Sequence, residues 1–420
     1  MSERGAVTLL VTVMVMTTAL ILVMRSHQSV RYQVAALEAI RERRASFWQA
    51  EGLIECLWAQ KYHAIMGGVD SGDISPCEIK TATVNLSGQR TTSLVVTVGH
   101  VTLERRYKLP LPTTPGVMKS SSHLILTQKA RFAPDPGEQD SNHQWQCAVL
   151  RYGHRFEAPS VTTYDLAQLT EKPYPDFPDL AGQTCATNYR SVAQDAAHTK
   201  QDYLYDPTLS LFEDLFGVDR AQWLQVMGSP DVGLVPLTLS LPASSSSLLP
   251  PPVFNQACAQ QIIERIDQGK MIIWVYGGCV FSDQEIEQMN QAIRATFHDH
   301  GIILVVQDGL LGIKSDRAFL GMLFHFLSPD QQNKRFERWP EIPWFDDMQP
   351  IVSDRAIPLE QLSYFQLGQF YPVAGLILDA ELHFAVIDGA LDFRYQRDWV
   401  MRPLSLIRPF SWASGSWDEH

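Results

Sequence analysis

Six cysteines are the residues of this sequence with the clearest chemistry. Their number is even, they are widely spaced, and none forms the Cys-x-x-Cys motif of metal and redox sites. Disulfide bonds in an oxidising compartment therefore explain them better than a metal or redox centre. Many pairings are possible, and we expect the sequential one because each pair then falls within one segment. The expected disulfides are Cys56–Cys77, Cys147–Cys185 and Cys258–Cys279.

Three other groups of side chains have types that could bind a metal or move a proton. His298, Asp299 and His300 place two imidazoles around a carboxylate, but they precede Gly301 without an evident third ligand. We expect solvated histidines at the end of a helix. His325 alternates with apolar residues, which favours a core or edge position. Acidic loops offer oxygen ligands for Ca²⁺ without the spacing of an EF-hand, and we expect them to be plain loops; their residues are Asp135, Glu138, Asp140, Asp176 and Asp179.

The sequence lacks the motifs of common enzyme classes. It contains no Gly-x-Ser-x-Gly, no His-Glu-x-x-His, no Gly-x-x-x-x-Gly-Lys-Ser/Thr and no Gly-x-Gly-x-x-Gly. We therefore expect no enzymatic activity, no cofactor, no metal and no small-molecule substrate. The net charge of −12 also argues against broad binding to polyphosphates. The basic run Arg-Glu-Arg-Arg at 41–44 is expected to be a solvated face of a helix or a pairing surface for acidic neighbours.

The beginning of the chain predicts a membrane-spanning helix. Residues 6–24 contain no charge, no Gly and no Pro, and this length is sufficient to cross a hydrocarbon core of about 30 Å. No cleavage site of the secretory type follows Met24. Instead, apolar residues recur with helical spacing at Val30, Val34, Leu37, Ile40, Phe47 and Ile54. We expect one helix from Ala6 to about His63, roughly 85 Å long.

The rest of the chain is predicted to be rich in β-structure. Residues 81–111 alternate as in an antiparallel meander of about three strands. The tract 110–206 is rich in Pro, Asp, Ser and Thr and is expected to form long loops. Short helices are expected at 210–228, with Asp219 as an N-cap, and a turn-rich linker at 242–252. Beyond it, short apolar runs separated by Gly or Asp-Gly predict strands joined by tight turns, with one helix after the capping box of Ser282 and Glu285.

Aromatic residues are concentrated in the last eighty residues or so. Clustered aromatics can mark an interaction surface when they are exposed. We expect them instead to be buried between stacked strands; they are Trp339, Trp344, Phe345, Trp399, Phe410, Trp412 and Trp417.

The N-terminal residues together resemble the type IV pilins and pseudopilins, most closely PilX-like minor pilins. The features are a short leader with Arg4 and Gly5, an apolar helix from Ala6, its amphipathic continuation, and Gln-Ala-Glu-Gly-Leu at 49–53. The resemblance implies that a prepilin peptidase cuts after Gly5 and that the new N-terminal Ala6 is methylated. It also implies that the helix packs on an antiparallel sheet. The C-terminal runs resemble, more loosely, the β-solenoid-like half of large PilX-like proteins.

One position departs from the family pattern. Most pilins carry Glu at the fifth mature position, which here is Leu10. That Glu is proposed to neutralise the N-terminus of a neighbouring subunit in the apolar filament core, where an unpaired charge is costly. Its loss is typical of PilX-like and GspK-like subunits, which are thought to sit at or near the filament tip. Leu10 is therefore expected to mark an initiating subunit, although a residue that only faces lipid would look the same.

The expected architecture is α+β, with a long N-terminal helix on an antiparallel sheet and a second, β-rich and solenoid-like domain. The expected divisions are a leader at 1–5, the helix at 6–66, a pilin-like domain at 67–241, the linker, and a C-terminal domain at 253–420. The implied function is a minor pilin at the tip of a type IV pilus, which primes assembly and contributes to adhesion or DNA uptake. The implied partners are other minor pilins, the major pilin, prepilin peptidase, inner-membrane lipid before assembly, and a host surface or DNA. The implied location is the inner membrane of a Gram-negative bacterium with a periplasmic domain, then the extracellular pilus tip.

Two alternatives stay open. A GspK-like tip pseudopilin of type II secretion shares the leader and the lost Glu, but that family inserts a mostly helical domain. A signal-anchored periplasmic enzyme of unfamiliar site geometry would also begin with a membrane helix. Failure of prepilin peptidase to cut after Gly5 would favour the enzyme over the pilin and pseudopilin class.

Overall fold

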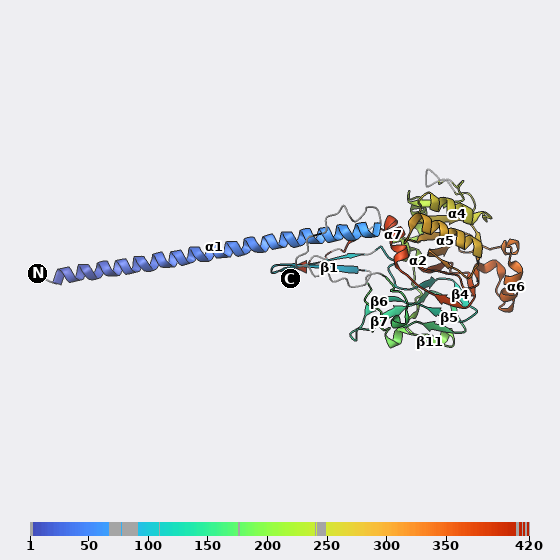
Figure 1. Ribbon diagram of the computed structural model, residues 1–420, viewed down its shortest axis with the longest axis horizontal. Coiled ribbons are helices and arrows are strands. Elements are labelled where there is room, and N and C mark those ends of the chain that lie inside the picture. The colour runs from blue at the N-terminus through green and yellow to red at the C-terminus, as the bar shows by residue number, and fades with distance from the viewer. Residues whose placement is uncertain are drawn as a thin grey trace.

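The first element of the protein is a single uninterrupted helix. In the computed structural model, which describes residues 3–66, 77, 91–108, 110–174, 177–239, 241, 249–408, 411–413, 415 and 418–419, helix α1 spans Glu3–Met66. Its 64 residues give a length of about 96 Å. The N-terminal part of α1 extends away from the rest of the molecule, which forms a compact head at its other end (Figure 1).

The C-terminal part of α1 packs on a small antiparallel sheet. Strands β1 (Thr91–Val98) and β2 (Val101–Lys108) pair along their full length. Two strands of the C-terminal tail, β25 (Ser411–Trp412) and β26 (Asp418–Glu419), also pair with β2. The shared core is apolar and comprises Ala50, Ile54, Leu94, Val96, Val101, Leu103 and Tyr107. Two strands of the meander expected at 81–111 are therefore present, while residues 81–90 lie outside the described part of the chain.

The head is built from parallel strands that stack in coils, and we call this part the solenoid. One coil contributes β22 (Leu376–Asp379), β23 (Phe384–Asp388) and β24 (Leu391–Phe393). They pair in parallel, one to one, with three strands that also follow each other in the sequence: β3 (Met118–Ser120), β4 (His123–Leu126) and β5 (Ala130–Phe132). Each of these two coils thus adds one strand to each of three sheets.

The largest sheet has eight strands. From one edge to the other they are β12 (Tyr203–Tyr205), β8 (Leu150–Tyr152), β3, β22, β19 (Gly321–Phe326), β16 (Ile302–Gln307), β14 (Ile272–Tyr276) and β13 (Val232–Val235). The second sheet has six, namely β15 (Cys279–Ser282), β17 (Leu311–Lys314), β20 (Leu362–Leu367), β23, β4 and β9 (Phe156–Glu157).

The third sheet is shorter and faces a different side of the solenoid. Its strands are β11 (Val192–Ala193), β10 (Val161–Thr163), β5 and β24, and only the β10–β11 pair is antiparallel. Two small pairs complete the β-structure: parallel β18 (Ala318–Phe319) with β21 (Tyr371–Pro372), and the hairpin of β6 (Asp135–Gln139) with β7 (Trp145–Ala148). Side chains that point inward from the three sheets form the largest apolar core.

The chain enters the stack in its middle. Strands from 118–205 continue the eight-stranded sheet beyond β22, and strands from 232–379 form its other half. Between β12 and β13, the chain must cross from one edge of this sheet to the other, about 34 Å at 4.8 Å per strand. The expected division at 242–252 therefore does not separate two sheets, because both sides of it contribute strands to the same ones. Residues 242–248 themselves lie outside the described part of the chain.

One sequence expectation about strands was wrong. The tract 110–206, expected to form long loops, contains β3 to β12, because its Pro, Gly and Asp residues end strands of two to five residues rather than preclude them. The Gly-separated C-terminal runs form parallel strands in stacked coils, in agreement with the solenoid-like arrangement expected for them. At their corners the backbones touch: a Cβ added at Gly309 would lie 2.0 Å from the carbonyl carbon of Gly277. Because glycine has no side chain, these positions allow the backbones of successive coils to stack in contact.

Helices cover the outer faces and one end of the solenoid (Figure 1). The outer face of the eight-stranded sheet is covered by α2 (Leu211–Phe216), η4 (Arg220–Gln222), α3 (Trp223–Met227) and α7 (Asp398–Ile407). Helices α4 (Cys258–Asp267) and α5 (Asp283–Phe297) pack together at the end opposite β11. Helix α6 (Phe345–Asp354) covers the six-stranded sheet at the end of the molecule farthest from the N-terminus. Short 3₁₀ turns are η1 (Leu166–Gln168), η2 (Thr187–Tyr189), η3 (Ala196–His198), η5 (Pro329–Gln331), η6 (Trp339–Glu341) and η7 (Leu359–Gln361).

Two expected helix starts are confirmed. Asp219 accepts a hydrogen bond from the Ala221 backbone N–H at the start of η4. Ser282 and Glu285 form a reciprocal capping box at the start of α5. The α+β class with a long N-terminal helix and a second β-rich region is thus as the sequence predicts, although the antiparallel sheet is small.

Candidate functional site

The most distinctive functional feature is the exposed apolar part of α1. Within the described residues, the stretch Leu9–Ala59 of this helix contains a window of mean hydropathy 2.0, and none of that window is buried in the protein. This helix is long and apolar enough to span a membrane. Its threonine hydroxyls are compatible with lipid, because Thr17 and Thr18 donate to the carbonyl oxygens of Val13 and Met14 at 2.9 Å.

The residues expected to be processed lie at the start of this helix. Gly5 and Ala6 have helical backbone conformation. Leu10 lies in the same helix, and 62% of its surface is exposed. A carboxylate at this position would face lipid without a partner in the monomer, whereas Leu is compatible with that environment. Cleavage after Gly5, methylation of Ala6 and the meaning of Leu10 stay predictions.

The six cysteines form three disulfides in the expected sequential pairing. Cys56–Cys77 joins the last part of α1 to the chain that follows it. Cys258–Cys279 joins the start of α4 to β15. Cys147–Cys185 joins β7 to a loop. The disulfides fit a periplasmic location of the head, because they persist in oxidising compartments.

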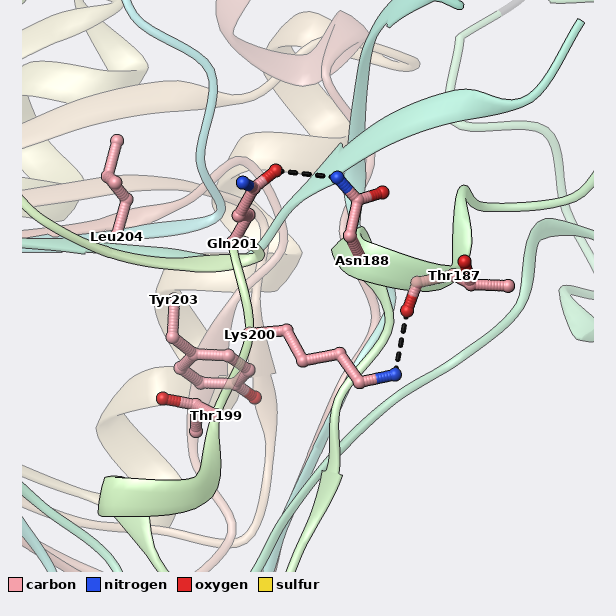
Figure 2. Close-up of a pocket in the computed structure, with 7 residues that line it drawn as sticks. All are labelled: Thr187, Asn188, Thr199, Lys200, Gln201, Tyr203 and Leu204. Carbon is pink, nitrogen blue, oxygen red and sulfur yellow. Dashed lines mark hydrogen bonds between the residues drawn. The ribbon is translucent and has the colours of Figure 1, made fainter. Parts of the chain in front are cut away.

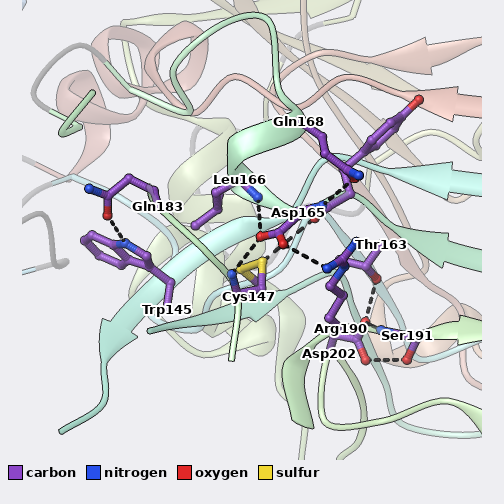
Figure 3. The surroundings of a disulfide bond; sticks show 12 residues. Trp145, Cys147, Thr163, Asp165, Leu166, Gln168, Gln183, Arg190, Ser191 and Asp202 are labelled. Atoms are coloured by element: carbon purple, nitrogen blue, oxygen red, sulfur yellow. Dashed lines mark hydrogen bonds and ion pairs between the residues drawn. A yellow bond between two sulfur atoms is a disulfide. The ribbon is translucent and has the colours of Figure 1, made fainter. Parts of the chain in front are cut away.

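The Cys147–Cys185 disulfide lies beside two carboxylates, the half-buried Asp165 and the buried Asp202, that organise the same loops (Figure 3). Asp165 accepts hydrogen bonds from the backbone N–H groups of Leu166 and Cys185 at 2.9 Å, and it pairs with Arg190 at 2.8 Å. Nearby, Asp202 accepts from the Ser191 backbone and from the hydroxyls of Thr163 and Ser191. The loops at 164–191 are therefore held by one covalent and several polar connections.

The histidines singled out from the sequence have structural surroundings. His298 is exposed just after α5, and burial and the nearby Arg402 lower the pKa of the half-buried His300. His325 is fully buried, its Nε2 lies 2.7 Å from the Gly309 carbonyl oxygen, and burial lowers its pKa to about 4. This is the core position expected for His325. Among the described residues, no three His, Cys, Asp or Glu side chains gather where a metal ion could bind.

The acidic residues considered for Ca²⁺ do not come together. Asp135 is buried, accepts a hydrogen bond from the Gly116 N–H and faces Arg397 at 3.8 Å. Asp140 closes a turn by accepting from the backbone N–H groups of Asn142 and Gln144. Asp179 pairs with Lys172 at 3.0 Å, Glu138 is exposed, and Asp176 lies outside the described residues.

The C-terminal aromatics are mainly core residues. Trp339 is fully buried and donates its indole N–H to the Leu362 carbonyl at 2.7 Å. Trp344 is 7% exposed, and Phe345 packs against the same core. Trp399 belongs to α7 and packs against the apolar core beneath that helix, and Trp412 packs against the core shared by α1, β1 and β2, while Phe410 and Trp417 lie outside the described residues.

A pocket that is open to the surface lies at the β12 end of the solenoid (Figure 2). Its volume is about 630 Å³, and its polar side chains are largely engaged with each other. Lys200 donates to the Thr187 carbonyl oxygen at 2.7 Å, and Asn188 donates to Gln201 at 2.7 Å. The residues that line it include no nucleophile paired with a base, and the pocket is a depression open to the surface.

Comparison with protein-family models, curated proteins and solved structures gives no match to this chain. Functional inference therefore rests on the chain's own sequence and structure.

Proposed function

We propose that this protein is a minor pilin of the PilX-like type that occupies the tip of a type IV pilus. The observation that carries the proposal is the construction of α1. Its first part is apolar, uninterrupted, exposed and preceded by Gly5, and its last part packs on an antiparallel sheet through residues such as Ala50 and Ile54. This combination suits a subunit that is first held in a membrane and then packed among other helices.

The size and place of the head support a position at the tip. The solenoid is far wider than α1 and lies wholly at its C-terminal end (Figure 1). Such a head would crowd neighbouring subunits in a helical shaft, but it has free space at the end of a filament. Leu10 agrees with this position, because a terminal subunit has no neighbour beyond it whose amine requires a carboxylate. In this role the protein would prime assembly with other minor pilins and the major pilin, and the head would contact a surface or DNA.

A tip pseudopilin of type II secretion, GspK-like, is less consistent with the head. That family inserts a mostly helical domain, whereas the described residues of this head form mainly parallel strands. The net charge of −12 favours contact with a surface over broad binding to DNA.

Processing tests the class of protein. Co-expression with a prepilin peptidase should yield a chain that begins at Ala6, and Gly5→Val should block the cut. Gly52→Val, in the same helix with no atom near an added Cβ, serves as a matched control and should be processed normally. N-terminal sequencing that finds Met1, or a cut after Met24, would exclude the pilin class.

Location tests the tip assignment. Deletion should reduce the number of pili sharply while the major pilin stays stable in the membrane. Labelled copies should appear about once per pilus at its distal end. Immunogold label distributed along the shaft would contradict the tip position even if processing occurs after Gly5.

A further inference from the structure

A second hollow of the head lies beside the third sheet of the solenoid. It has a volume of about 210 Å³ and is more enclosed by protein than the pocket at the β12 end. One wall is the loop after η1, which contributes Thr170 and Glu171. The opposite wall comes from the last coil, through Tyr371, Arg394 and Gln396.

Charged groups in this hollow are held in place by neighbours. The Arg394 guanidinium donates to Asp392 at 2.8 Å and to the Tyr164 hydroxyl at 3.1 Å, and it lies over the Tyr164 ring. Tyr371 lines the same hollow, and its ring packs beside that of Phe393 with the centroids 5.3 Å apart. A guanidinium donor and a phenol therefore occupy fixed positions on one wall.

The facing wall is equally fixed. Gln396 donates to the Glu171 carboxylate, and the Gln396 oxygen accepts from the Trp399 indole N–H at 2.6 Å. The η1 turn that precedes this loop is capped by Asp165, whose carboxylate binds two backbone N–H groups and Arg190. The Cys147–Cys185 disulfide fastens the segment next to it. The hollow is thus largely preformed, which lowers the entropic cost of binding a ligand.

The chemistry of the walls selects a class of ligand. Glu171 accepts hydrogen bonds and Arg394 donates them within one small space, so a ligand with adjacent groups that both donate and accept is favoured. Hydroxyl groups on a ring have this property. A phosphate or carboxylate would be repelled by Glu171 and Asp392, and a cation by Arg394. The Tyr371 ring and Val373 add an apolar surface against which C–H groups can pack.

We propose that this hollow binds one neutral sugar residue of a glycan. Its volume suits a single hexose ring, with adjacent hydroxyls donating to Glu171 and accepting from Arg394. The site gives a chemical class to the surface contact in the proposed pilus function and rests on that function only for its biological role. Binding in the hollow needs no filament, so the two proposals can fail separately.

The test uses the full chain in detergent micelles with free glucose, galactose, mannose and N-acetylglucosamine. Saturation-transfer difference NMR should detect at least one of them, and titration should give its Kd. Glu171→Gln should weaken this Kd about tenfold, because it replaces a charged acceptor at an exposed position by a neutral one. Arg394→Gln should weaken it at least as much.

Arg155→Gln is the matched control. Arg155 is an exposed Arg paired with Glu157 at 3.0 Å on β9, and it does not line the hollow. This variant should bind the sugar as the unchanged protein does, and equal melting temperatures should show that each variant is folded. Binding of none of the four sugars, or equal binding by Glu171→Gln and the unchanged protein, would overturn the proposal. Normal processing after Gly5 in the same preparation would leave the pilin assignment standing.

Discussion

The indole of Trp58 in α1 stacks on the indole of Trp412 in the C-terminal tail, with ring centroids 4.3 Å apart. The guanidinium of Arg105, on β2, lies 3.7 Å from the centre of the Trp412 ring and pairs with Glu55 of α1. Three segments that are far apart in the sequence therefore interlock at one point. We call this point the neck, because the long helix joins the head there.

Replacement of Trp412 should loosen the neck. Trp412→Ala removes the stacked ring and the surface under Arg105, which should cost about 2 kcal/mol of local stability. Hydrogen exchange of the β2 amides should become correspondingly faster, while amides of the solenoid should be unaffected. Trp412→Phe retains an aromatic ring and should lose less. Unchanged exchange in β2 after the Ala substitution would show that the tail does not hold the neck.

Local sequence signals predicted the elements that depend on nearby residues. The long helix follows from an apolar run and its amphipathic continuation, and the start of α5 follows from Ser282 and Glu285 three positions later. The solenoid pairing could not be predicted this way, since its partners are distant. Ser121 donates to Asp379 at 2.7 Å although 258 positions separate them. Short parallel strands also look like loops, because each one is ended by the same Gly, Pro and Asp residues.

The sugar site was missed for the same reason. Glu171 and Gln396 are in contact, yet they are 225 positions apart and belong to no motif. Glu171 lies in a Pro-rich stretch that the sequence predicts to be a loop, and Arg394 follows a strand in a different part of the chain. Only the return of the last coil beside the loop after η1 brings them together.

A buried ion pair should hold strand β3, the first strand of the solenoid along the chain, against helix α2. Lys119 on β3 and Asp214 on α2 form a salt bridge and are 2% and 5% exposed in their side chains. Burial alone would raise the pKa of Asp214, but the Lys119 charge and hydrogen bonds from Lys119 and Thr114 lower it overall. Lys119→Met should destabilise the head by about 3 to 5 kcal/mol, because it leaves a buried carboxylate without its cation.

The double variant Lys119→Met with Asp214→Leu separates charge from packing. Removing both charges should recover much of the stability lost by Lys119→Met, since two apolar side chains need no charge partner. Urea unfolding followed by tryptophan fluorescence measures both variants. Equal losses in the single and double variants would mean that shape, and not the unpaired charge, determines the cost.

His325 should make the stability of the head depend on pH. Its pKa falls from 6.5 to about 4 on folding because burial disfavours the imidazolium. Between pH 4 and pH 6.5 the unfolded chain therefore binds the extra proton, and stability must decrease as the pH falls through this window. The stabilisation from neutral His325 is fully present above pH 6.5. Its loss at pH 4 should be about 3 kcal/mol.

The variant His325→Gln isolates this contribution. Gln can still donate to the Gly309 carbonyl but does not titrate, so its stability should vary less between pH 4 and pH 6.5. The difference between the two pH profiles cancels other groups, including the nearby His383. Parallel profiles of the variant and the unchanged protein would contradict the assignment of the pH dependence to His325.

Removal of the Cys147–Cys185 disulfide should release the loops at 164–191 while the solenoid stays folded. The bond closes a span of 38 positions, and restricting such a span in the unfolded chain contributes about 3 to 4 kcal/mol. Without the disulfide, only the polar contacts of Asp165 and Asp202 hold these loops. We therefore expect the loops to open locally. Limited proteolysis of the variant with Ser at both Cys147 and Cys185 should therefore cut first within 164–191.

The variant with Ser at both Cys258 and Cys279 is the control. It should keep these loops protected, since the disulfide that it lacks joins α4 to β15 elsewhere in the head. Equal protection of the loops in both variants would show that the polar contacts suffice without the disulfide.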